Sequence, residues 1–169
     1  MYFGKIDTMD IANGDGIRVT LFVSGCRNHC EGCFQPKTWN FKYGQPFTEE
    51  IENYIINSLN HDFVSGLTLL GGDPFEPENA EVLAKFVKKV KQIYPNKSIW
   101  CYTGYKFEEL HISSVPSFRK LIEQIDVLVD GKFEQQLYQP GLKFRGSANQ
   151  RIIDVPATLT NGEIILKYT

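Results

Sequence analysis

Three cysteines within eight residues carry the clearest chemical signal in this sequence. Cys26, Cys30 and Cys33 form a C-x3-C-x2-C cluster directly after the apolar, β-rich run 18–23. Thiolates at such short spacing can converge on one inorganic centre, and three of them supply all but one of the ligands of a cubane iron-sulfur cluster. The fourth iron is then open to a substrate, in the same way that an open ligand position distinguishes catalytic from structural metal sites.

Two other interpretations of the cysteines stay open at this point. One is a zinc site completed by His29, His61 or Cys101, which is weakened because the sequence has no second close ligand pair such as C-x2-C or H-x3-H. The other is a set of buried or redox-active thiols. His29 is more simply a polar loop residue, and Cys101, in the middle of an apolar run, is more simply a buried core thiol.

Length and charge limit the class of protein. The 169 residues are 42% hydrophobic, which predicts one domain over residues 1–169 with a proper core. The formal net charge of -2 offers no electrostatic footprint for nucleic acid or for an anionic membrane. The first residues lack the features of a signal peptide and no apolar run is long enough to span a bilayer, so we expect a cytoplasmic protein with reduced cysteines.

Short apolar runs alternate with amphipathic segments, which is typical of βαβ units and a mostly parallel sheet. Strands are expected over residues 18–23, 67–70, 99–102 and 125–129, and helices over 48–59, 78–94 and 117–124. Thr48 is the expected N-cap of the first helix. From Arg151 onward, apolar residues at 152–155 and 164–166 predict one or two further strands.

Each of the four central strands runs into a glycine-bearing segment: 24–26, 71–74, 103–105 and 130–132. Because the carboxyl ends of parallel strands share one edge, where ligands bind, these segments predict one composite site. A closed (β/α) barrel needs about 250 residues. The chain is therefore expected to form an α/β fold, an open partial barrel of five or six mostly parallel strands.

The segment Gly71-Gly72-Asp73-Pro74 has a bland and a functional interpretation. By itself it marks a turn. Glycines also let backbone groups approach a ligand closely, and at the end of a strand they could bind the amino group of an amino-acid-like molecule. The nearby cysteine cluster favours the second interpretation.

The cysteine cluster followed by a strand and Gly-Gly-Asp-Pro resembles the radical S-adenosylmethionine superfamily. More narrowly, the chain is similar to the anaerobic ribonucleotide reductase activating proteins, from near its amino terminus to about Gln150. The segments that carry this likeness are 13–18, 20–26, 37–39, 102–105, 127–133 and 145–150.

That resemblance implies a fold of the radical S-adenosylmethionine type and a specific reaction. Three cysteines hold a [4Fe-4S] cluster, whose electron cleaves S-adenosylmethionine to a 5'-deoxyadenosyl radical, and the radical takes a hydrogen atom from a glycine of the large reductase subunit. The implied partners are this glycyl radical enzyme and an electron donor of the flavodoxin or ferredoxin type.

Residue roles follow from the same resemblance. Cys26, Cys30 and Cys33 are the implied cluster ligands, and no catalytic side chain is implied beyond the cluster and the cofactor site. The segment Gly71, Gly72, Asp73 and Pro74 matches the motif for the methionine amino group, and Gly32, Cys33 and Phe34 match the backbone beside the adenine. Asp130 and Lys132 resemble an Asp-x-Lys pair near the cofactor, with an exposed turn as the alternative.

Three positions deserve comparison with the wider pattern. Gly32 replaces the aromatic residue usual before the third cysteine, and Asp73 replaces Glu; both variants resemble the reductase-activating branch. Asp15 stands where that branch commonly has proline, which puts the local turn in doubt.

Alternative functions are a pyruvate formate-lyase type activase, a deazaguanine synthase, or a zinc-binding interaction module. Lysines 85, 88, 89 and 91 form either a solvated helix face or a contact for an acidic patch. The polar residues Arg145, Ser147, Asn149 and Arg151 are candidates for partner or cofactor contacts.

Overall fold

The computed structural model describes residues 1–169 and contains one eight-stranded sheet with five α-helices. The strands are β1 (Tyr2–Asp10), β2 (Ile17–Val23), β3 (Gln45–Pro46), β4 (Val64–Gly71), β5 (Ser98–Tyr102), β6 (Val127–Asp130), β7 (Arg151–Asp154) and β8 (Leu166–Tyr168). The helices are α1 (Glu49–Ser58), α2 (Pro77–Ile93), α3 (Phe107–Ile112), α4 (Pro116–Ile122) and α5 (Val155–Asn161), with short 3-10 helices η1 (Pro36–Trp39) and η2 (Gln135–Leu137).

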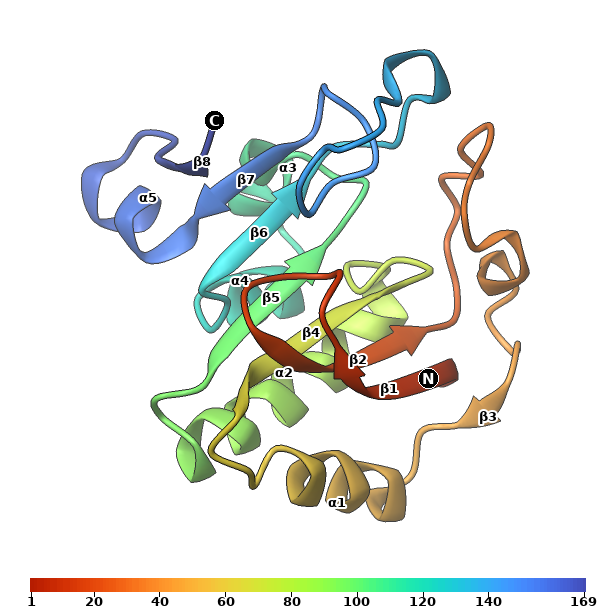
Figure 1. The fold of residues 1–169 in the computed structure, drawn as a ribbon, viewed down its shortest axis with the longest axis vertical. Coiled ribbons are helices and arrows are strands. Elements are labelled where there is room, and N and C mark those ends of the chain that lie inside the picture. Colours follow the sequence, from red (N-terminus) through yellow and green to blue (C-terminus); the bar gives the residue numbers. More distant parts are fainter.

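The sheet has a parallel centre and antiparallel flanks. Its strand order is β3-β1-β2-β4-β5-β6-β7-β8, and the neighbours from β2 to β6 are parallel (Figure 1). The other four pairings are antiparallel. The mixed α/β class is as predicted. The prediction of five or six mostly parallel strands was wrong, because further strands join both edges of the sheet by antiparallel pairing.

The central elements agree with the expectations from periodicity, and the chain ends do not. The four expected central strands correspond to β2, β4, β5 and β6, and the three expected helices to α1, α2 and α4. The Thr48 side chain caps α1 by accepting a hydrogen bond from the Ile51 N–H group. Strand β1 and helices α3 and α5 were not predicted.

Helix α5 begins at Val155, where the sequence analysis predicted a strand. The strand expected over 152–155 stops at Asp154, whose side chain accepts a hydrogen bond from the Ala157 N–H group as the N-cap of α5. An Asp cap followed by Pro156 is a helix start, and it outweighs the strand preference of Val155. The last strand begins only at Leu166, later than the expected 164.

The two faces of the sheet have different coverings. Ile99 and Cys101 of β5 belong to the main core of 28 buried residues, to which strands and helices both contribute, whereas Trp100 belongs to a small cluster on the opposite face. In Figure 1, α2 and α4 lie behind the sheet. Cys101 is fully buried, which confirms its interpretation as a core thiol. No helix combines the length and apolar character that crossing a bilayer would require.

The exposed face of α2 carries the lysine run. Lys85 and Lys88 are exposed, while Lys91 pairs with Asp126 at 2.7 Å and Lys89 lies 3.5 Å from Glu52. Two lysines of the run are thus exposed, and two pair with neighbouring elements.

A buried arginine ties the parallel strands together at their amino ends. The Arg18 guanidinium donates to the Thr68 hydroxyl at 2.7 Å, to the Leu67 carbonyl at 3.0 Å and to the Asp15 carbonyl at 3.0 Å. It also donates to the hydroxyl and carbonyl oxygens of Ser98. Burial lowers the pKa of Arg18 to about 10, but five hydrogen bonds satisfy its donors.

Replacing this arginine should destabilise the fold. Arg18→Met leaves buried oxygens without donors, and we expect the free energy of unfolding to fall by about 2–4 kcal/mol. Urea denaturation measures the change. The matched control is Arg119→Met, because Arg119 is exposed on α4. Equal losses in the two variants would contradict a structural role for Arg18.

Candidate functional site

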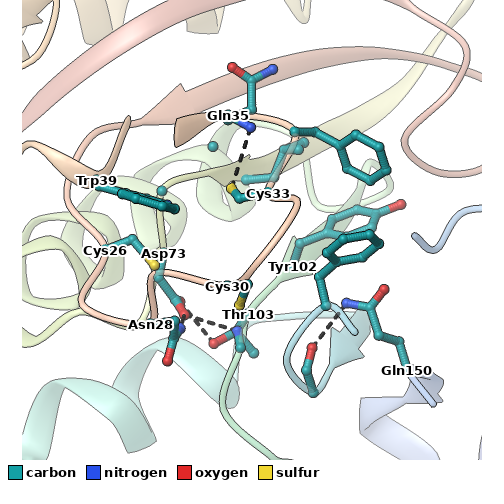
Figure 2. Close-up of a pocket in the computed structure, with 17 residues that line it drawn as sticks. Cys26, Asn28, Cys30, Cys33, Gln35, Trp39, Asp73, Tyr102, Thr103 and Gln150 are labelled. Carbon is teal, nitrogen blue, oxygen red and sulfur yellow. Dashed lines mark hydrogen bonds between the residues drawn. The ribbon is translucent and has the colours of Figure 1, made fainter. Parts of the chain in front are cut away.

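The site is a pocket at the carboxyl ends of the parallel strands. It is lined by Cys26, Asn28, Cys30, Cys33, Phe34, Gln35, Trp39, Leu70, Gly71, Gly72, Asp73, Tyr102, Thr103, Gly104, Gly131, Phe133 and Gln150. All four glycine-bearing segments contribute to this lining, so the expected composite site is present. Figure 2 shows the cysteines around the pocket, with Trp39 on one side and Tyr102 on the other.

The three cysteines are placed differently within their loop. Cys26 is 8% exposed directly after β2, whereas Cys30 and Cys33 are half-buried. Burial raises the pKa of the Cys26 thiol to about 11 and also raises that of Cys30. The Cys33 sulfur accepts a hydrogen bond from the Gln35 N–H group. All three are free thiols that open onto one pocket, which suits the donor set of an iron-sulfur cluster.

A single zinc ion suits these residues less well. No group of three or more His, Cys, Asp or Glu side chains converges closely enough to hold one metal ion, as a structural zinc site requires. Neither His29 nor His61 lines the pocket. The His29 ring instead stacks on Trp39 with centroids 4.4 Å apart.

Glycine is required where the cysteine loop meets the segment after β4. The Gly72 N–H group donates to the Val23 carbonyl at 2.7 Å, and the Asp73 N–H group donates to the Gly25 carbonyl at 2.8 Å. A Cβ atom on Gly72 would lie 2.5 Å from the Gly25 oxygen, and Gly71 has a φ of +114°. These two glycines therefore let the backbones approach directly.

Asp73 connects three of the segments that form the pocket. One carboxylate oxygen accepts hydrogen bonds from the Phe75 N–H group at 2.9 Å and the Thr103 hydroxyl at 2.8 Å. The other accepts from the Gly104 N–H group at 2.9 Å and the Asn28 side chain at 3.1 Å. The carboxylate is thus a positioning group within the protein. No pattern in the sequence identifies Asn28 as a residue of the site or predicts its contact with Asp73.

A second anchor holds the cysteine loop from outside. The Arg27 guanidinium donates to the carboxylates of Glu76, which is 2% exposed, and Glu78, and it lies over the Phe41 ring at 4.5 Å. The Arg27 N–H group also donates to Glu76. Because Glu76 and Glu78 stand at the start of α2, the cysteine loop is fixed to that helix.

Other predicted residues lie outside the pocket lining. Pro74 is buried beside Asp73, and Gly32 has a left-handed φ of +73° against the Gln135 side chain. Lys132 is exposed next to the lining residues Gly131 and Phe133.

Asp130 takes part in a separate ionic network. Its carboxylate is 1% exposed, accepts the Phe107 N–H group at 2.8 Å and pairs with Arg151. Arg151 also forms a bidentate pair with Glu108, whose pKa it lowers to about 2. Asp130 therefore joins β6, β7 and α3.

The segment between β6 and β7 is held by side chains near its end. Gln150 accepts from the Gly146 and Ser147 N–H groups and donates to the Gly131 carbonyl at 2.9 Å. The Asn149 side chain donates to the Lys132 carbonyl at 2.8 Å. Gln150 itself lines the pocket, so this network shapes one wall of the site.

Asp73 should leave a measurable pH signature in the metal-free protein. Its burial outweighs its four hydrogen bonds and raises its pKa from 3.8 to about 6, so the folded chain binds the proton more tightly than the unfolded chain. The stability of wild type relative to Asp73→Asn should therefore fall as pH rises from about 4 to about 6, on the order of 1–3 kcal/mol.

Urea denaturation across this pH range measures the difference, with Asp62→Asn as a variant of an exposed carboxyl. A relative stability that rises with pH would mean that the hydrogen bonds outweigh burial.

Comparisons with known proteins agree with this site. A family model described as a 4Fe-4S single cluster domain matches residues 12–153. Three relatives are each named anaerobic ribonucleoside-triphosphate reductase-activating protein. The Pasteurella multocida protein is 49% identical over 85% of this chain and 90% of its own length.

The Escherichia coli K12 relative is 46% identical over 89% of this chain and 96% of its own length. The relative from Enterobacteria phage T4 is 41% identical over 90% of this chain and 93% of its own length. Similarity of this extent, together with the cysteine pocket, shows that the chain belongs to the family of anaerobic ribonucleoside-triphosphate reductase-activating proteins.

Proposed function

We propose that this protein activates anaerobic ribonucleoside-triphosphate reductase by generating its glycyl radical with S-adenosylmethionine. The observation that carries the proposal is the shared pocket, in which three free cysteines face glycine-bearing segments from the ends of the parallel strands. The named activity of relatives that align over most of the chain supports the same function.

We propose that Cys26, Cys30 and Cys33 hold the [4Fe-4S] cluster of the matching domain class. When bound, this group supplies the electron that cleaves the sulfonium of S-adenosylmethionine. Binding to iron requires thiolates, so Cys26, with its raised pKa, must release the proton on its sulfur as the cluster assembles. The buried position of Cys26 and the anchors at Arg27 and Asn28 limit movement at the start of the ligand loop.

Pocket segments around the cysteines are proposed to bind the nucleoside cofactor. Gly71 and Gly72, with Asp73 and Pro74 fixing their loop, would receive the methionine amino group. The backbone of Gly32, Cys33 and Phe34 would run beside the adenine. The Phe34 ring lines the pocket, which supports this placement.

For the Asp-x-Lys pair we propose two separate roles. The exposed Lys132 would approach the cofactor from beside Gly131, whereas Asp130 would act through Arg151 by fixing the end of β6. The buried ion pair of Asp130 supports a positioning role over direct cofactor contact.

We further propose that residues 1–169 form a single domain in which β2, β4, β5 and β6 are the parallel centre of an open, partial barrel of the radical S-adenosylmethionine type. Four free cysteines support a reducing, cytoplasmic location. A flavodoxin or ferredoxin type protein is the proposed electron donor. The charge of -2 supports an activity without nucleic acid.

The alternatives are less favoured. A pyruvate formate-lyase type activase or a deazaguanine synthase would share the cluster, but the relatives above carry another name. A zinc module lacks a converged ligand set.

The function is tested by anaerobic reconstitution. Protein loaded with iron and sulfide and reduced with dithionite should convert S-adenosylmethionine to 5'-deoxyadenosine and methionine. Mixing with the cognate reductase should then produce a glycyl radical doublet in the electron paramagnetic resonance spectrum. Intact S-adenosylmethionine in the presence of a reduced cluster would contradict the proposal.

Substitution of single cysteines should separate ligands from the core thiol. Loss of an outer-shell partner alone commonly costs about 10–100-fold, so Cys26→Ala, Cys30→Ala or Cys33→Ala should lower 5'-deoxyadenosine formation at least about 100-fold, with iron content reduced. Cys101→Ala is the matched control and should keep its iron, because Cys101 lies in the core. Equal loss of iron in all four variants would refute the ligand assignment.

A further inference from the structure

We propose that Phe34, Leu137 and Tyr138, here called the apolar rim, form the surface on which the glycine-bearing segment of the reductase docks. This inference rests on the proposed function, since it assumes that a glycine of the partner must reach the pocket.

The apolar rim is an exposed cluster made by two separate segments. Phe34 of the cysteine loop is 65% exposed, and Leu137 and Tyr138, between β6 and β7, are 39% and 51% exposed. The Phe34 ring lies 6.2 Å from the Tyr138 ring and 5.0 Å from the Phe133 ring, between centroids. Exposed apolar side chains that gather in this way mark interaction sites more often than isolated ones do.

The position of the apolar rim links it to the pocket. Phe34 and Phe133 both line the pocket with the three cysteines, and Tyr138 contacts Phe34 from outside this lining. A polypeptide that enters the pocket from the side of Phe34 therefore contacts the rim. By contrast, the exposed Tyr54 lies on α1, which contributes nothing to the pocket lining.

The part of the rim between β6 and β7 is held in place before any partner binds. The Ala148 N–H group donates to the Leu137 carbonyl at 2.9 Å, and Tyr138 pairs with Ser147 in an isolated β-bridge. The Ser147 hydroxyl accepts the Glu134 N–H group at 3.1 Å. Figure 1 shows this segment extending beyond the sheet. Such preorganisation lowers the entropy lost on binding.

Charge favours an uncharged polypeptide as the occupant. Residues 134–141 are all exposed, and Glu134 is their single charged member. An acidic electron carrier would be expected to seek cations. The nearest ones in the sequence, the exposed Lys132 and Lys143, flank this stretch and do not belong to it. Tyrosine, as at position 138, is among the residue types that are enriched where single side chains contribute strongly to protein–protein binding.

Two variants test the docking surface in the full-length, cluster-loaded protein. Tyr138→Ser and Leu137→Ser should each raise the Kd for the cognate reductase at least tenfold, measured by anaerobic calorimetry. Glycyl radical formation at subsaturating reductase should fall in parallel. Formation of 5'-deoxyadenosine with dithionite and without reductase should stay within twofold of wild type.

Tyr54→Ser is the matched control, because Tyr54 is 52% exposed and Tyr138 51%. Thermal melting establishes that the variants fold. A Kd within twofold of wild type in either folded rim variant, or an equal rise in Tyr54→Ser, would overturn the docking surface. Absence of 5'-deoxyadenosine in wild type would instead overturn the proposed function, and the Kd values would still decide the docking surface.

Discussion

The buried carboxylate of Asp73 is the interaction on which the shape of the pocket depends. It receives hydrogen bonds from Asn28 in the cysteine loop and from Thr103 and Gly104 after β5, while its own backbone N–H group donates to Gly25. Three loops that are far apart in sequence are thereby fixed around one charge. Burial of that charge is unfavourable, as its raised pKa shows, so the arrangement exchanges some stability for a defined site.

The rest of the sheet places these loops at one edge. Parallel pairing from β2 to β6 brings the carboxyl ends of four strands together, and Arg18 joins the amino ends of three of them through Thr68, Leu67 and Ser98. Antiparallel strands at both flanks extend the sheet without adding further loops of the same kind to the site. The structure thus separates a rigid frame from the segments that carry the chemistry.

Sequence patterns predicted the features that depend on neighbours in the chain. The glycine-bearing strand ends, the Thr48 cap and the buried position of Cys101 all follow from local sequence, and the structure agrees. Strand β1 was missed because its residues are mostly half-buried and show little alternation. The strand expected to include Val155 was wrong because the Asp154 cap starts a helix there.

Features that depend on distant contacts were beyond local sequence. The resemblance implied an Asp-x-Lys pair near the cofactor, but it gave no sign that the Asp130 carboxylate pairs with Arg151, 21 residues further along. Likewise, the Asn28 side chain meets Asp73 across 45 residues. Such pairings depend on the order of the strands in the sheet and on which loops lie close together. The hydrophobic periodicity of the sequence does not predict either of these.

The proposed function depends on a cubane cluster in the pocket, whose fourth iron would bind S-adenosylmethionine. Electron nuclear double resonance can detect this bond in the reduced, reconstituted protein, with S-adenosylmethionine labelled with nitrogen-15 in its amino group. We predict a nitrogen-15 hyperfine coupling to the cluster. Absence of that coupling, with the fourth iron bound instead by a side chain of this protein, would contradict the claim.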